Sequence, residues 1–182
     1  MKIRRFLWLV VAVVCMLPLG AQTAYHQYIN QYAPMAQDQM KRYGIPASIT
    51  LAQGLLESGA GKSKLAREAR NHFGIKVGMN WTGPYMIMAD DRPDDKFRVY
   101  HTVSDSYEDH SAFLRNGKRY ASLFDLSPTD YKGWAHGLKR AGYATNPSYA
   151  QSLINIIERY NLHDYDKKRH HRRDDKIEHK AK

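Results

Sequence analysis

The sequence predicts a mainly α-helical (α+β) domain with one small β-hairpin inserted near its middle. Apolar residues recur at helical spacing before residue 70 and again after residue 103. Between these regions, the stretches 85–88 and 96–100 look extended and flank ADDRPDD, which is rich in turn formers. The chain has 182 residues, 43% of them hydrophobic, which is enough for one compact core and too little for two comfortable domains.

Capping signals indicate where the helices begin and end. Pro34 lies inside the helical pattern of residues 25–43, so we expect it to divide that stretch or to begin a second helix. Pro46 suits the first turn of the next helix. The later helix starts that the sequence predicts are at Ser63, Ser104, Ser127 in SPTD, and Asn146-Pro147.

The start of the chain differs in character from the body. Basic residues up to Arg5 precede an uncharged apolar run over residues 6–19, and small or polar residues follow it. This pattern is typical of a secretory signal peptide, here residues 1–24, and it predicts export to the periplasm or the cell surface. After cleavage we expect no stable membrane insertion. The alternative is an uncleaved anchor, although the run is short for a membrane span.

The end of the chain is strongly basic. The formal net charge is +10, and much of the excess lies in the signal region and in the last residues. The segment DKKRHHRRDDKIEHKAK holds one large apolar residue, Ile177, so it cannot bury enough surface to order itself. We therefore expect a folded domain at residues 25–164 and a basic flexible tail at 165–182. A solvated tail is the simpler interpretation, and contact with anionic polymers is the alternative.

Several classes of chemistry are disfavoured by composition. Cys15 is the only cysteine and lies in the apolar run, so a mature chain would lack disulfides, a thiol nucleophile and a cysteine zinc site. The nine histidines form no H-E-x-x-H motif, which argues against a zinc amidase or peptidase. We expect no metal and no cofactor. A mildly basic body is weak support for nucleic-acid binding, so no nucleic-acid partner is expected.

The segment LAQGLLESGAG at 51–61 places an acid at the end of an apolar helix. Thr50, Gln53, Gly54 and Glu57 share one narrow polar face of this helix. Partial burial and the negative end of the helix dipole both disfavour a carboxylate and raise its pKa. Glu57 is therefore a candidate general acid, with the neighbouring glycines leaving room for a substrate. The alternative is a solvated surface glutamate.

Three blocks of the sequence resemble the bacterial glucosaminidase family, a group of cell-wall hydrolases (glycoside hydrolase family 73-like) that includes the flagellar muramidase-like domain. They are SITLAQGLLESGAGKSKLAREARNHFGIK (48–76), FRVYHTVSDSYEDHSAFL (97–114) and LKRAGYATNPSYAQSLINIIERYNL (138–162). The resemblance implies a lysozyme-like helical lobe with a small β-hairpin lobe forming a cleft. It also implies cleavage of the β-1,4 bond after N-acetylglucosamine, with peptidoglycan glycan strands as partner.

The resemblance also implies roles for individual residues. Glu57 is then the catalytic acid, Tyr143 the active-site tyrosine, and Asn71 and Phe73 belong to a block that lines the cleft. A sugar ring favours an aromatic face, which Phe73 and Tyr143 can offer, and we add three further candidates for substrate contact: Gln53, Trp81 and Tyr85. Core packing is the alternative for any aromatic residue, and we expect it for Tyr28, Tyr32, Tyr149 and Tyr160.

The hairpin tip offers candidates for a second carboxylate. A glycosidase generally needs one about 5–10 Å from the acid. We place Asp91 ahead of Asp90, because both directly follow the first strand, whereas Asp94 and Asp95 follow a proline and suit a turn. If all four only form the turn, the acetamido group of the substrate can act as nucleophile. A lytic transglycosylase and a non-catalytic wall-binding protein are the alternative functions.

Overall fold

The computed structural model describes residues 19–78, 81–90 and 92–167, with side chains from residue 23 onward. Most of the expected signal peptide (1–18) and most of the expected tail (168–182) lie outside this part. The elements follow in the order α1 (Leu19–Tyr43), α2 (Ala47–Ser58), α3 (Lys64–Ala69), β1 (Tyr85–Ile87), β2 (Lys96–Arg98), α4 (Val103–Asn116), the 3-10 helix η1 (Lys118–Asp125), α5 (Tyr131–Arg140), α6 (Tyr149–Arg159) and the 3-10 helix η2 (Leu162–Asp166).

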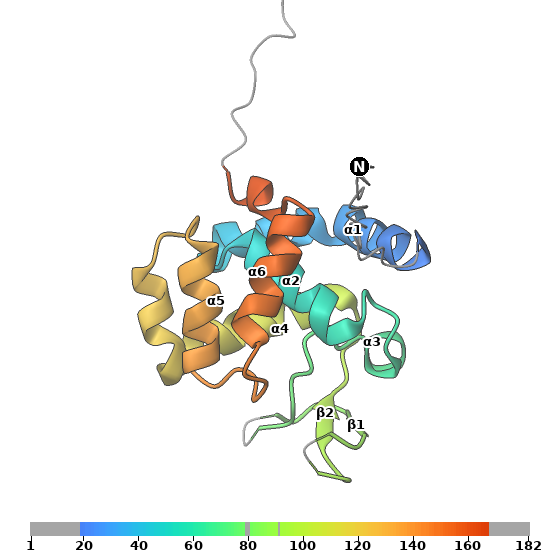
Figure 1. Ribbon diagram of the computed structural model, residues 1–182. Coiled ribbons are helices and arrows are strands. Elements are labelled where there is room, and N and C mark those ends of the chain that lie inside the picture. Colours follow the sequence, from blue (N-terminus) through green and yellow to red (C-terminus); the bar gives the residue numbers. More distant parts are fainter. Residues whose placement is uncertain (1–18, 79–80, 91, 168–182) are drawn as a thin grey trace, which may run out of the picture.

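Helix α2 lies at the centre of the helical body and is covered by α1, α5, α6 and η2 (Figure 1). Every residue of α2 is buried except Leu56 and Glu57, which lie in its last turn. The helix ends at Gly59, which has a left-handed backbone with φ 57°, a conformation that glycine adopts at little cost. The apolar run in the sequence therefore becomes the inner helix of the core, and its single carboxylate lies at the open end.

Helix α1 continues through Pro34 as one helix, so our expectation that Pro34 divides this stretch was wrong. An interior proline removes one backbone hydrogen bond and costs about 3 kcal/mol. Tyr28, Ile29, Ala33 and Ala36, on both sides of Pro34, are all buried against the body. Burial of this continuous apolar face offsets the cost of the proline.

The expected hairpin is confirmed and projects from one end of the helical body (Figure 1). Strands β1 and β2 pair in antiparallel fashion, with Tyr85 opposite Arg98 and Met86 opposite Phe97. Phe97 is buried with Leu65 and Ala69 of α3 in a small cluster of its own. The mainly α fold with one inserted hairpin is therefore the architecture that the sequence predicts.

Three of the expected helix starts were wrong by two or three residues. Ser148, not Asn146, is the residue that precedes α6. Thr102, not Ser104, caps α4, where its hydroxyl accepts from the Asp105 amide and the Asp105 side chain accepts from the Thr102 amide. Asp130, not Ser127, caps α5, because the Asp130 amide closes a turn onto the Ser127 carbonyl before the helix begins. The Ser63 cap of α3 is confirmed by its hydrogen bond from the Ala66 amide.

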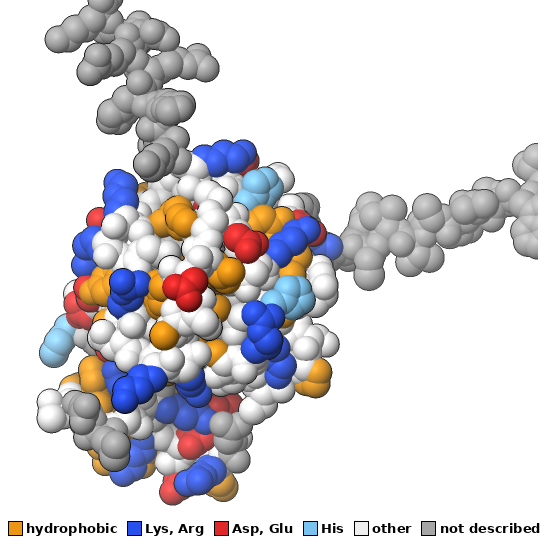
Figure 2. Space-filling model, turned by 90° about the vertical axis from the view of Figure 1, so that its left-hand side faces the viewer, with side chains coloured by type: hydrophobic (Ala, Val, Ile, Leu, Met, Phe, Trp, Pro, Cys, Tyr) orange, Lys and Arg blue, Asp and Glu red, His pale blue; other side chains and the backbone are white. Residues whose placement is uncertain are grey.

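The surface carries charges of both signs. On the face shown in Figure 2, Lys and Arg side chains are interspersed with acidic ones and do not gather into one patch. Among the described helices, none is both long enough and apolar enough to cross a membrane.

The folded body extends two residues beyond the boundary that we placed at 164. The N-terminus of α2 follows Pro46, which has no side-chain acceptor for the first amides of the helix. Asp166, at the end of η2, supplies that acceptor: its Oδ1 accepts from the Ser48 amide at 2.8 Å, and its Oδ2 accepts from the Ser48 hydroxyl. Gln37 also donates to the Tyr165 carbonyl at 3.1 Å.

We predict that a chain ending at residue 164 is less stable than one ending at residue 167. Loss of a helix cap costs about 0.5–2 kcal/mol, and truncation leaves the buried Ser48 groups unpaired. Asp166→Ala in the longer chain reproduces most of the loss, whereas Asp164→Asn, at an exposed neighbouring carboxylate, serves as the matched control. Urea unfolding measures all four proteins. Equal stability of the two chain lengths would show that the boundary at 164 was adequate.

Candidate active site

Glu57 is half-buried in the last turn of α2 and has one direct hydrogen-bond partner among the described side chains. The Tyr149 hydroxyl, from the first turn of α6, donates to Glu57 Oε1 at 3.0 Å. Burial raises the pKa of Glu57 above its usual value of 4.5, and the negative charge of Asp90 adds to this, while the hydrogen bond from Tyr149 acts in the opposite direction. The carboxyl group therefore keeps its proton to a higher pH than an exposed glutamate does.

Gln53 supports this site from inside the protein and does not face a substrate, so our expectation that it contacts sugar was wrong. Its side chain is fully buried one turn before Glu57. Gln53 Nε2 donates to the Tyr149 hydroxyl at 3.0 Å, and its Oε1 lies 3.2 Å from His110 Nε2. Both ends of the amide are engaged within the protein, and full burial keeps its remaining N–H and lone pair away from a ligand.

Tyr149 and His110 are the site residues that sequence reasoning missed. Tyr149 is buried, as expected, but its hydroxyl reaches the candidate acid. Nothing local distinguishes it from the other inward-facing tyrosines. His110 does carry a signal, because it is a polar residue between Tyr107 and Leu114 on the inner face of α4.

Tyr143 lies beside this pair, in the loop between α5 and α6. Its ring stacks on the Tyr149 ring, with centroids 5.7 Å apart and an interplanar angle of 18°. Its hydroxyl donates to the Phe73 carbonyl at 3.3 Å. Burial raises the pKa of Tyr143 well above its usual value, and the negative potential of its neighbours Tyr149 and Glu57 adds to this. It is therefore a neutral phenol next to the acid.

Asn71 and Phe73 hold the wall of the site and are almost fully buried, so neither is free to contact a sugar in the way that we expected. Asn71 Nδ2 donates to the carbonyls of Ile75 and Arg98, at 2.9 and 3.0 Å, which fastens the loop after α3 to β2. The Phe73 ring stacks on the imidazole of His110, with centroids 3.9 Å apart.

Gly54 makes room for the protein itself and not for a substrate, which corrects our interpretation of the glycines near Glu57. A Cβ at this position would overlap the hydroxyl of Tyr28 from α1. That hydroxyl is hydrogen-bonded to His72 Nδ1 at 2.8 Å and to the Tyr107 hydroxyl at 2.9 Å. The glycine thus lets three elements meet beneath the turn that carries Glu57.

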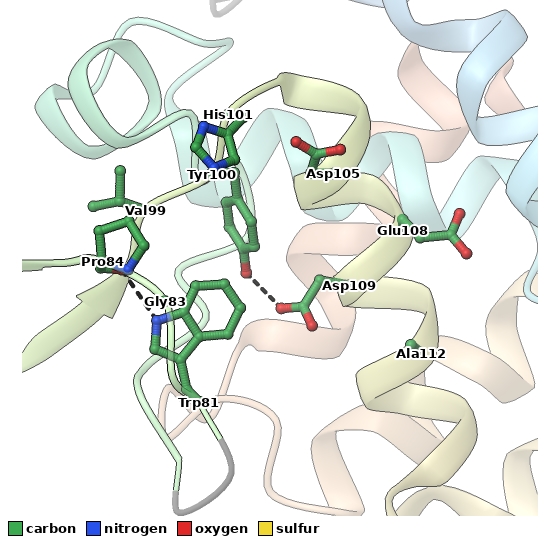
Figure 3. A pocket seen from close by; sticks show the side chains of 10 residues that line it. All are labelled: Trp81, Gly83, Pro84, Val99, Tyr100, His101, Asp105, Glu108, Asp109 and Ala112. Carbon is green, nitrogen blue, oxygen red and sulfur yellow. Dashed lines mark hydrogen bonds between the residues drawn. The ribbon is translucent and has the colours of Figure 1, made fainter.

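Trp81 lines a pocket of about 380 Å³ between the base of the hairpin and α4 (Figure 3). Its indole Nε1 donates to the Pro84 carbonyl at 3.0 Å, and its ring meets the Tyr100 ring edge to face. The opposite wall is the outer face of α4, which includes Asp105 and Asp109. His110 points from the other side of α4, so this pocket is separated from the Gln53 amide by the helix.

Tyr85 lies on β1 and is half exposed. The Lys96 ammonium lies 4.8 Å above the centre of its ring, and the neighbouring exposed Ile87 shares its face of the hairpin. Tyr85 therefore presents an accessible aromatic ring, as a sugar contact requires, although none of its contacts joins it to Glu57.

The hairpin brings one acid within electrostatic reach of Glu57. Asp90 raises the pKa of Glu57 through its negative charge, and it is held by an ion pair with Lys76 at 2.8 Å. Lys76 makes a second ion pair with Asp95, also at 2.8 Å. Asp91, our first choice for the second carboxylate, lies outside the described residues. Within the described part of the chain, no three His, Cys, Asp or Glu side chains gather closely enough to hold a metal ion.

Comparison with known proteins places this arrangement in a family. Residues 33–162 match the Glucosaminidase family model, described as mannosyl-glycoprotein endo-beta-N-acetylglucosaminidase. The chain is 36% identical over 152 residues to exo-glucosaminidase LytG of Bacillus subtilis (strain 168), covering 76% of this chain and 52% of LytG. It is 32% identical over 143 residues to peptidoglycan hydrolase FlgJ of Escherichia coli (strain K12), covering 72% of this chain and 45% of FlgJ. It thus spans about half the length of these curated relatives.

Solved structures share the fold over most of their length. The peptidoglycan hydrolase from Sphingomonas sp. A1 superposes with a TM-score of 0.67 at 30% identity, covering 76% of this chain and 91% of that one. The glycoside hydrolase domain of Salmonella typhimurium FlgJ gives a TM-score of 0.63 at 30% identity, covering 77% and 90%. Because the family model matches well over half of the sequence and these structures share its fold, the chain belongs to the glucosaminidase family.

Proposed function

We propose that this protein is an exported peptidoglycan hydrolase that cleaves the β-1,4 glycosidic bond after N-acetylglucosamine, with Glu57 as general acid. The observation that carries the proposal is the half-buried Glu57 at the open end of α2, with a raised pKa and a phenolic hydrogen-bond donor on its carboxylate. Family membership supports the reaction class. The names of the relatives, an exo-glucosaminidase and a peptidoglycan hydrolase, support the substrate class.

In the first step, protonated Glu57 donates its proton to the glycosidic oxygen as the bond to the leaving sugar breaks. The resulting carboxylate is stabilised at once by the hydroxyl of Tyr149, which already points at Oε1. Burial favours the proton before the transfer, and the hydrogen bond favours the anion after it. General acid catalysis of this kind contributes roughly two to four powers of ten in rate.

As that bond breaks, a nucleophile, or a water molecule activated by a base, must form a new bond to the anomeric carbon from the face opposite the acid. We propose Asp91, then Asp90, as this nucleophile or base, since both come soon after β1 in the sequence and the charge of Asp90 reaches Glu57. The acetamido group of the substrate is the alternative nucleophile. We propose that Tyr143, a neutral phenol stacked on Tyr149, helps to orient the group that attacks. Tyr85 and Trp81 are the aromatic residues that we propose for binding the glycan.

Product analysis distinguishes this function from the two alternatives. Purified peptidoglycan fragments are incubated with the protein, and the products are identified by mass spectrometry. Hydrolysis after N-acetylglucosamine gives a reducing N-acetylglucosamine end with the mass of one added water. An anhydro sugar would instead show a lytic transglycosylase. Unchanged fragments that remain bound to the protein would show a non-catalytic wall-binding protein.

We predict that Glu57→Gln abolishes cleavage and leaves the fold intact. Glutamine keeps the shape of the side chain and the acceptor for Tyr149, but it has no proton to donate. Turnover on soluble glycan should fall at least about a hundredfold, with an unchanged circular dichroism spectrum. Leu56→Ala, at the exposed neighbouring position, is the control and keeps its activity. Turnover near the wild-type level in Glu57→Gln would remove Glu57 from the mechanism.

The same variant should alter how stability depends on pH. Because the pKa of Glu57 is raised in the folded state, the folded protein binds this proton more tightly than the unfolded chain does. The wild type therefore loses stability as pH rises from about 4.5, the unfolded value, to the folded pKa. Glu57→Gln lacks this loss. Its free energy of unfolding relative to wild type should rise across that interval and stay constant above it, as measured by urea unfolding at each pH.

The roles of the hairpin acids are separated by kinetics on a defined glycan. If Asp91 or Asp90 is the base, Asp91→Asn, Asp90→Asn or the double variant loses turnover at every pH. If Asp90 acts only through its charge, Asp90→Asn keeps its maximal rate, and its alkaline limb moves to lower pH because the pKa of Glu57 falls. Asp94→Asn, at an exposed position of the turn, is the control. If the double variant keeps turnover near the wild-type level, neither acid is the base, and the acetamido group of the substrate remains as the proposed nucleophile.

A further inference from the structure

We infer that Gln53 and His110 are positioning residues, which direct the hydroxyl proton of Tyr149 toward Glu57 through a one-way chain of buried hydrogen bonds. The chain runs from His110 Nε2 to Gln53 Oε1, from Gln53 Nε2 to the Tyr149 hydroxyl, and from that hydroxyl to Glu57 Oε1. Its heavy-atom distances are 3.2, 3.0 and 3.0 Å. The inference deepens the proposed function and rests on Glu57 being the acid.

The direction of the chain follows from the surroundings of His110. Its side chain is fully buried, with the Phe73 ring stacked on one face. His110 Nδ1 has no hydrogen-bond partner among the described residues. A proton on Nδ1 would thus be a buried unpaired donor. Nε2 and Gln53 Oε1 would then both be acceptors, with no proton between them to form a hydrogen bond. The neutral imidazole therefore carries its proton on Nε2 and donates it to Gln53.

The orientation of the Gln53 amide then decides the orientation of the Tyr149 hydroxyl. With Oε1 engaged by His110, the Gln53 NH₂ group faces Tyr149 and donates to the phenolic oxygen. The phenol has a single proton, which is left for Glu57 Oε1. A reversed amide would accept the phenolic proton and leave the Tyr149 lone pairs facing the carboxylate. His110 opposes that reversal because its Nε2 proton requires the amide oxygen as acceptor, although Gln53 and Tyr149 stand between His110 and Glu57.

The charged groups around the chain do not compete with it. Asp90 faces Glu57 from the hairpin, and its charge is shared with Lys76. Tyr143 adds a neutral phenol beside Tyr149. On α4, Asp109 is next to His110 in sequence but is held by Arg98 at 2.7 Å on the outer face of the helix.

The imidazole also keeps one charge state. Burial lowers the pKa of His110 to about 3, so the ring is neutral wherever Glu57 titrates. The chain therefore has a constant direction across the working range of the acid. Its effect is to favour the Glu57 carboxylate and to hold its pKa below the value that burial alone would impose.

The test measures the pKa of Glu57 directly, by NMR titration of its side-chain carboxyl carbon, with the resonance assigned by its absence in Glu57→Gln. Tyr149→Phe should raise this pKa by about one unit, since it removes a hydrogen bond to a charged group. Gln53→Met and His110→Phe should raise it in the same direction by less. Tyr43→Phe is the matched control, because it removes a hydroxyl that donates to Glu108 and takes no part in the chain, and it should leave the pKa unchanged.

Two further measurements test whether the residues act as one chain: the pKa of Glu57 in a double variant, and the pH dependence of kcat/KM. If the residues act as one chain, Gln53→Met adds nothing to the pKa shift of Tyr149→Phe in the double variant. The alkaline limb of kcat/KM on soluble glycan moves upward with the NMR value. If His110→Phe does not fold, the Gln53 and Tyr149 variants and their combination decide the question.

Two outcomes separate failure of the inference from failure of the proposed function. The inference is overturned if the pKa of Glu57 does not change in folded Gln53→Met and His110→Phe while turnover falls equally at every pH. Gln53 and His110 would then only support the structure of the site. Full activity of Glu57→Gln, with the NMR shifts still present, would instead remove the acid role while the hydrogen-bond chain stands.

Discussion

Helix α2 is buried along almost its whole length, yet it carries polar side chains, and each of these must find its partner inside the protein. Ser48 is paired with Asp166 at the start of the helix, and Gln53 is paired with Tyr149 and His110 in the middle. Among the polar side chains of α2, only Glu57, in the last turn, is partly exposed to solvent. The same burial that demands these partners also raises the pKa of Glu57. The internal pairing of the polar side chains and the raised pKa therefore have the same physical cause.

The side chains that pair with α2 or pack against it come from several other helices of the body. Tyr28 reaches Gly54 from α1, His110 reaches Gln53 from α4, and Tyr149 reaches Glu57 from α6. Because these contacts converge on one helix, they hold the turn that carries Glu57 from three sides. A hydrolase that protonates a glycosidic oxygen benefits from this rigidity, since the proton must be delivered at a fixed position.

The hairpin lobe contributes in another way, through charge and accessible aromatic surface. Lys76 joins Asp90 and Asp95 by ion pairs and so ties the turn of the hairpin to the strand-like segment before it. Trp81 and Tyr85 belong to the same lobe but have separate environments: Trp81 is packed against Tyr100 beside α4, whereas Tyr85 is open to solvent. The buried aromatic wall next to Glu57 is built by Tyr143, Tyr149 and Phe73.

The sequence by itself determined the helices, the inserted hairpin and the position of Glu57 at the end of an apolar helix. These features depend on residues fewer than about five positions apart, and periodicity and capping report such short separations. Only the tertiary structure decided that Tyr149 binds Glu57 across 92 positions of sequence, and that Asp166 caps α2 across 118. Periodicity shows that a side chain such as Gln53 or Asn71 shares a face with others, but it does not show what covers that face. For this reason residues expected to touch sugar proved to be buried supports, and a tyrosine expected to fill the core proved to hold the acid.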